Sequence, residues 1–174
     1  MSELTGDWGK IANLFNPLAL KSALHRAAER VGNEGRTRVI KGIQSGAPAG
    51  IPFKPNSPLT IAMKGSSKPL INHGDLIGSI TYENVDDNYI FIGVKKGKEA
   101  NIAAVHEFGC TIKVTPKMRA YLHYNGVHLR ASTQYIHIPA RPFLRPVLLG
   151  HEFTSDVVAK IYLEALRTVF PSWL

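Results

Sequence analysis

His106-Glu107 is the residue pair in this chain that most resembles a catalytic motif. In the helical zinc-protease pattern His-Glu-x-x-His, two histidines four positions apart bind the metal, and the glutamate acts as general base. Cys110 occupies the second histidine position here, so the ligand pair is incomplete. Further ligands could come from His123, His128 and His137 only if strand register brought them together, and no Cys-x-x-Cys pair is present. We therefore predict no metal site.

Other reactive constellations are also missing from the sequence. It contains no nucleophile elbow, no phosphate-binding glycine loop and no paired-carboxylate motif. We predict that the chain is not an enzyme and uses no cofactor. The notable polar and aromatic residues are instead candidates for contacts with other subunits. These interface candidates are Arg119, Tyr121, His123, Asn125, Gly126, His128, Arg130, Arg141 and Arg145.

Length and composition favour a single domain spanning residues 1–174. A chain of 174 residues with 44% hydrophobic content buries roughly 70% of the surface that its unfolded form exposes, which is enough for a core. No apolar stretch approaches the roughly 20 residues that span a bilayer, and no signal peptide is recognisable. The lone Cys110 cannot form an intramolecular disulfide. We expect a soluble protein with no membrane partner, made in a reducing cytoplasm.

The chain carries an excess of positive charge. Lys and Arg number 21 against 13 Asp and Glu, and the isoelectric point is near 9.7. This balance favours an acidic partner surface or a nucleic acid. The alternative is a well-solvated basic surface, because the charges do not form one run.

The first third of the sequence predicts a long helix. Residues 1–15 are amphipathic but lack helix boundaries, and we expect a flexible arm. Asn16-Pro17 is a typical helix start, apolar residues then recur every three or four positions, and Gly46 and Pro48 end the pattern. The opposite face carries five cations: Arg26, Arg30, Arg36, Arg38 and Lys41. They form either a solvated helix face or a phosphate-binding stripe.

The remaining sequence predicts an α+β fold. Residues 46–72 are a long, proline-rich, irregular loop that is apolar enough to pack on the body or on a neighbouring subunit. A small antiparallel sheet should follow, beginning with strands at 79–85 and 89–94. Asn125-Gly126, a favoured hairpin turn, predicts a projecting β-hairpin over 117–130. A C-terminal helix should pack with the long N-terminal helix on this sheet.

The stretch IPARPFLRPVL, Ile138 to Leu148, should form a rigid corner between the sheet and the last helix. Proline fixes its own φ and biases the preceding residue toward extended geometry, so Pro139 and Pro142 can end a strand and begin a helix. Phe143 is then an apolar anchor, while Arg141 is free either to cross an interface or to cap carbonyls within its own subunit. Both roles for Arg141 stay open at this point.

Three strings of the chain resemble motifs of a known family. KPLINHGDLIGSI, IAAVHEFG and IPARPFLRPVL occur in the order seen in tailed-bacteriophage virion morphogenesis and tail completion proteins. The resemblance covers roughly residues 35–149. His73 departs from the threonine usual in the first motif, which removes a short capping side chain from that turn.

The resemblance implies a structural role in the virion. A family member of this kind is expected in the neck, where it completes the tail and joins it to the head connector as a ring subunit, with sixfold symmetry like the tail. Its partners would be further copies of itself, a head-completion or stopper ring, and a tail terminator or tail tube, after assembly in the host cytoplasm. Two alternatives remain: a tail terminator that caps the tail tube, and a basic channel protein that contacts genomic DNA.

Overall fold

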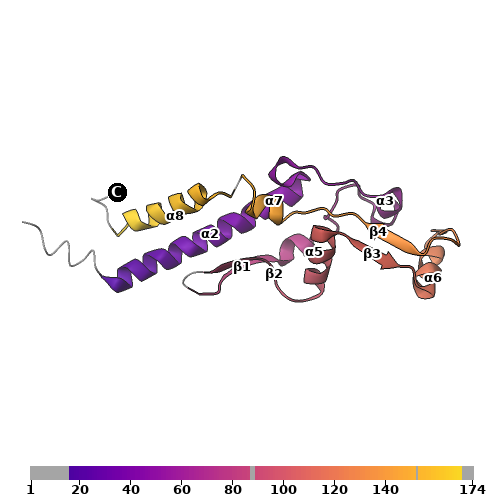
Figure 1. The fold of residues 1–174 in the computed structure, drawn as a ribbon, viewed down its shortest axis with the longest axis horizontal. Helices are drawn as coiled ribbons and strands as arrows, with labels where there is room; N and C mark the ends of the chain where they lie inside the picture. Colours follow the sequence, from indigo (N-terminus) through magenta and orange to yellow (C-terminus); the bar gives the residue numbers. More distant parts are fainter. Residues whose placement is uncertain (1–15, 87–88, 152, 170–174) are drawn as a thin grey trace, which may run out of the picture.

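The computed structural model describes residues 16–86, 89–151 and 153–169. The fold is α+β and elongated, with α2 (Pro17–Ser45) and α8 (Ser155–Arg167) side by side at one end (Figure 1). Next to α2 lies an antiparallel hairpin of β1 (Ile80–Asn84) and β2 (Ile90–Val94). The other elements lie toward the opposite end. The predicted flexible arm, residues 1–15, lies outside the described residues.

Helix α2 begins and ends where the local sequence signals place it. The Asn16 side chain accepts hydrogen bonds from the Leu18 and Ala19 amides at 3.1 and 3.3 Å, and Gly46 ends the helix at a φ of +75°. Gly32 allows close packing along the helix, because a Cβ there would lie 2.4 Å from the Tyr82 ring. Capping residues thus set the two ends of α2. Gly32 lets the β1–β2 hairpin pack closely against the middle of the helix.

The main core lies against the C-terminal part of α2. Short helices α4 (Asp75–Ser79) and α7 (Arg145–Leu148) and helix α5 (Lys98–Phe108) surround it. Phe143 and Val147 of the proline-rich corner are fully buried there. The remaining buried members of the cluster are Val39, Ile43, Leu76, Ile80 and Ala103. The corner therefore lies inside the core, as its apolar residues predict.

The basic face of α2 is occupied by contacts within the chain. Arg30 pairs with Glu164 of α8 at 2.8 Å, Arg36 donates to the Ile80 carbonyl at 2.8 Å, and Arg38 pairs with Glu34 at 2.7 Å. The Arg30 hydrogen bond lowers the pKa of Glu164. These bonds favour a structural helix face over a phosphate-binding stripe.

The expected single sheet is wrong, because the strands form two separate pairs. β1 pairs with β2, whereas β3 (Cys110–Lys113) pairs antiparallel with β4 (Tyr135–Ile138), far along the chain. Helix α5 and its terminal Gly109 lie between the two pairs in sequence. The strands expected at 79–85 and 89–94 are confirmed as β1 and β2, but an alternating pattern does not show which strands share a sheet.

The predicted β-hairpin over 117–130 is also wrong. Pro116–Tyr124 is a helix, α6, whose N-cap Thr115 accepts a hydrogen bond from the Met118 amide at 3.1 Å. At its end Gly126 takes a φ of +79°, and the Gly126 and Val127 amides donate to the His123 and Leu122 carbonyls at 3.0 and 2.8 Å. This is the Schellman arrangement. Asn125-Gly126 therefore ends a helix, because the left-handed glycine that a hairpin turn needs serves a helix terminus equally well.

The long loop, 46–72, packs along the body as expected but is not entirely irregular. It contains the short helices η1 (Pro48–Gly50) and α3 (Pro58–Lys64). Ser57 caps α3 and Gly65 ends it with a φ of +70°, so local helix signals were present within the loop. Within the described part of the chain, no helix is both long and apolar enough to cross a bilayer.

Candidate functional site

A buried junction joins α5 to the proline-rich corner. Glu107 is 7% exposed, and its carboxylate accepts three backbone hydrogen bonds, from Phe143 at 2.8 Å and from Leu144 and Arg145 at 3.0 Å each. These amides belong to the turn that leads into α7, where no earlier carbonyl is available to them. Glu107 therefore acts as a carboxylate cap for a segment more than thirty residues away in sequence.

Close backbone approach seals the same junction. The Arg141 amide donates to the His106 carbonyl at 2.7 Å. Gly109 has a φ of +76°, and a Cβ at this position would lie 2.9 Å from the Ala140 nitrogen. The position thus requires glycine both for its conformation and for its packing. His106-Glu107-Phe108-Gly109 and the corner form one structural unit, not a metal motif.

Arg141 is an internal brace. The residue is 6% exposed, its Nε donates to the Lys54 carbonyl at 2.6 Å and its Nη2 to the Pro55 carbonyl at 2.8 Å. Burial lowers its pKa. Of the two roles left open for Arg141, the structure supports carbonyl capping within its own chain, which ties the long loop to the corner.

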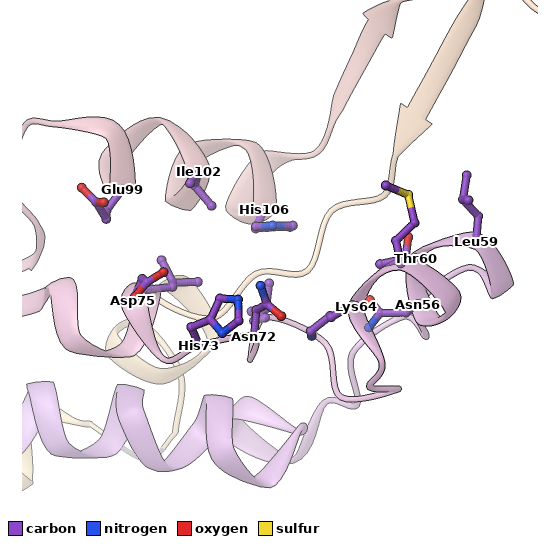
Figure 2. Close-up of a pocket in the computed structure, with 13 residues that line it drawn as sticks. Asn56, Leu59, Thr60, Lys64, Asn72, His73, Asp75, Glu99, Ile102 and His106 are labelled. Carbon is purple, nitrogen blue, oxygen red and sulfur yellow. The ribbon is translucent and has the colours of Figure 1, made fainter. Parts of the chain in front are cut away.

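A groove of about 630 Å³ lies between α3, α4 and α5. Apolar side chains such as Leu59 and Ile102 line it together with the polar groups of Asn72 and His73. Figure 2 shows His106 on α5 facing toward α3 and the segment before α4. The groove thus combines apolar walls with hydrogen-bonding side chains.

His106 is the most unusual polar group of this groove. Its Nδ1 atom is buried without a hydrogen-bond partner. Burial lowers the pKa of His106, and the positive charges of Arg141 and Lys64 lower it further. Lys64 itself donates to the Lys68 carbonyl, and its pKa is lowered by burial and by Arg141. The histidine is thus held in its neutral form near pH 7.

The end of the molecule away from α8 is a small lobe that we call the distal lobe, residues 110–138, built from β3, α6 and β4 (Figure 1). Arg119 holds it together by donating to the carbonyls of Leu129, Arg130 and Thr133 at 3.3, 3.0 and 2.7 Å. The rings of His123 and His128 meet edge to face with centroids 4.5 Å apart. Several interface candidates therefore lie together although the expected hairpin does not form.

Exposure separates these candidates into two groups. Tyr121 is 60% exposed, and six others are also exposed: His123, Asn125, Gly126, His128, Arg130 and Arg145. Arg145 stacks on the Phe108 ring with its guanidinium carbon 4.6 Å from the centroid. Arg119 and Arg141 instead donate to carbonyls of their own chain. Among the described residues, no three His, Cys, Asp or Glu side chains cluster to hold a metal.

The three strings that resemble family motifs lie together in the folded chain. Each contributes buried residues to the core, and the second and third also meet at the junction. A family model for phage virion morphogenesis proteins matches residues 7–167. The chain belongs to the phage virion morphogenesis family. Neither a search of curated proteins nor a search of solved structures found a match.

The junction is formed by residues of the strings that resemble the phage virion morphogenesis family. Two of the strings that carry the resemblance contain Glu107 and the three amides that it caps. Sequence reasoning missed this role because it considered Glu107 only as part of an incomplete zinc motif. The available signal was the corner itself, whose backbone amides at a helix start require an acceptor. His73, the departure from the usual threonine, is exposed beside Gly74, which begins α4 without a side-chain cap.

Proposed function

We propose that this phage virion morphogenesis protein is a structural subunit of the virion neck, which completes the tail and joins it to the head connector. The observation that carries this proposal is the family match over residues 7–167. The family has a structural and assembly role. We place no catalytic step on the chain.

We further propose that the subunits form a ring, sixfold like the tail, and that the distal lobe contacts a neighbouring subunit or the tail tube. The support is physical. The lobe lies at one end of an elongated body (Figure 1), and the C-terminal part of its α6 carries Tyr121 at 60% and Tyr124 at 89% exposure. Tyrosine is enriched in protein interfaces, since it offers a large apolar surface with one polar group.

Electron microscopy of particles made without this protein tests the neck assignment. Full capsids beside separate tails of normal length are the expected result if the protein is needed only to join the two. Tails of unregulated length would assign the chain to tail termination instead, and empty capsids would place it in DNA packaging or retention.

Substitution of exposed tyrosines tests the contact. A Tyr121→Ala, Tyr124→Ala double variant should fold normally but fail to join heads to tails. Tyr89→Ala is the matched control, because Tyr89 is 68% exposed at the far end of the β1–β2 hairpin. Normal joining by the double variant would contradict the proposed use of the distal lobe.

A further inference from the structure

The distal lobe lies within a stretch of the chain that lacks carboxylates. No Asp or Glu occurs between Glu107 and Glu152, and six Lys and Arg residues lie in that interval. The whole chain has a formal net charge of +8, so most of its excess charge is concentrated in this quarter of the sequence. In α2, by contrast, the charges of Arg30 and Arg38 are paired with the carboxylates of Glu164 and Glu34.

Three exposed cations come from three different parts of the lobe. Lys113 lies on β3, Lys117 in the first turn of α6, and Arg130 in the segment that returns to β4. Arg119 brings the third part close to α6, because its guanidinium binds the Arg130 carbonyl at 3.0 Å. The lobe thus presents cations from a fixed scaffold, with Arg119 as a positioning residue.

One face of the β3–β4 ribbon adds neutral polar side chains to these cations, two of which, Thr111 and His137, are hydrogen-bonded to each other at 3.2 Å. Thr111 pairs with His137 and Lys113 pairs with Tyr135 across the two strands, and all four residues are exposed. Residues at alternate positions point to the same face of a strand pair, so these four share one face. Lys, Tyr and Thr side chains are among the usual donors to phosphate oxygens.

We propose that the distal lobe binds the phosphate backbone of duplex DNA without sequence specificity. Duplex DNA carries one negative charge per roughly 1.7 Å of helix axis and no positive charge. A surface free of carboxylates attracts such a ligand at every point, whereas an acidic protein face usually mixes both signs of charge. The chemistry of Lys113, Lys117 and Arg130 therefore favours DNA over an acidic protein, whereas the protein contact proposed above uses the exposed Tyr121 and Tyr124.

The proposal is tested by titrating full-length protein into a fluorescein-labelled duplex of mixed sequence and measuring fluorescence anisotropy. The distal variant combines Lys113→Gln, Lys117→Gln and Arg130→Gln. The control variant combines Lys41→Gln, Lys96→Gln and Lys160→Gln, which removes the same charge from exposed positions elsewhere. Circular dichroism confirms that both variants are folded.

The salt dependence gives the expected size of the effect. Each phosphate contact contributes about 0.9 to the slope of log affinity against log salt. Three contacts therefore predict that, from about 50 to 200 mM salt, the wild type loses roughly 40-fold more affinity than the distal variant does. The control variant should follow the wild type within about threefold, because it changes only net charge.

Three results would overturn the proposal. The first is no binding of the duplex at low salt. The second is an equal loss in the distal and control variants, which would make net charge sufficient. The third is displacement of the duplex by poly-glutamate of equal charge as effectively as by unlabelled DNA, which would assign the lobe to an acidic protein. All three are independent of where the protein sits in the virion.

Discussion

Replacement of Glu107 by alanine should destabilise the protein more than any exposed carboxylate replacement. The change removes the acceptor for the amides of Phe143, Leu144 and Arg145, which lie 2.8–3.0 Å from the carboxylate. A hydrogen bond to a charged group contributes about 1.5–3 kcal/mol, and an unsatisfied buried donor costs about 1–3 kcal/mol. These effects overlap, because the three amides share one carboxylate. We expect a loss of about 3–5 kcal/mol in the free energy of unfolding.

Urea unfolding followed by circular dichroism measures this loss directly. Glu83→Ala is the control, because Glu83 pairs with Lys95 at 2.8 Å with both side chains about half exposed, and such pairs contribute about 0–1 kcal/mol. In a thermal scan, Glu107→Ala should lower the midpoint by roughly 10 °C, given about 2–4 °C per kcal/mol for a chain of this size. Glu107→Gln keeps the side-chain volume but sets an amide group against the backbone donors, and should also destabilise.

The result that would refute this reasoning is a small effect. If Glu107→Ala and Glu83→Ala both cost less than about 1 kcal/mol, the capping geometry contributes little to stability. The junction would then be a passive contact between two packed segments. A large effect for Glu107→Ala with a small one for Glu107→Gln would assign the loss to side-chain volume and not to capping.

Three further predictions concern the same region. Gly109→Ala should lower the free energy of unfolding clearly more than Gly65→Ala does, because Gly65 has a similar φ but open space around it. Gly65→Ala should cost about 1 kcal/mol. Equal losses for the two variants would contradict the close backbone approach at Gly109. Arg141→Met should release the loop, 46–72, which limited proteolysis would detect as new early cleavage there, and an unchanged digestion pattern would contradict the brace. Because the pKa of His106 is lowered in the folded state, the unfolded chain takes up the proton first, so stability should fall as pH drops below about 6.5. In unfolding titrations at several pH values, His106→Gln should lose less stability at low pH than the wild type does. An identical pH dependence in the two proteins would refute the role given to His106.

Local sequence signals were sufficient to predict the parts of the structure that depend on residues close together in the chain. Asn16-Pro17 and Gly46 bound α2, because capping and left-handed geometry act within one turn of the chain. Phe143 is buried, as an apolar residue beside prolines in a corner predicts. The same kind of signal failed at Asn125-Gly126, since a left-handed glycine fits both a hairpin and a helix end. The choice was decided by Thr115, whose side chain caps α6.

The features that sequence reasoning could not reach depend on contacts between distant segments. Glu107 caps amides 36 to 38 positions later, and Arg141 binds carbonyls 86 and 87 positions earlier. Neither partner can be found from spacing or periodicity. Two arginines expected at an interface, Arg119 and Arg141, are instead used within the chain, where each guanidinium donates to several carbonyls at once.

The distal lobe is the surface that the proposed assembly role depends on most. Its β3–β4 pair begins and ends beside the junction, where the Arg141 amide donates to the His106 carbonyl, so residues of the family motifs hold the lobe to the body.

The most direct test of the neck assignment is complementation in vitro. An extract from cells infected with phage lacking this protein would supply heads and tails, and infectious titre would be measured after purified protein is added. We predict that the wild type and Tyr89→Ala restore the titre and that the Tyr121→Ala, Tyr124→Ala variant does not. No rise in titre with the wild-type protein, while the extract is rescued by a crude wild-type extract, would contradict the assignment to head-to-tail joining.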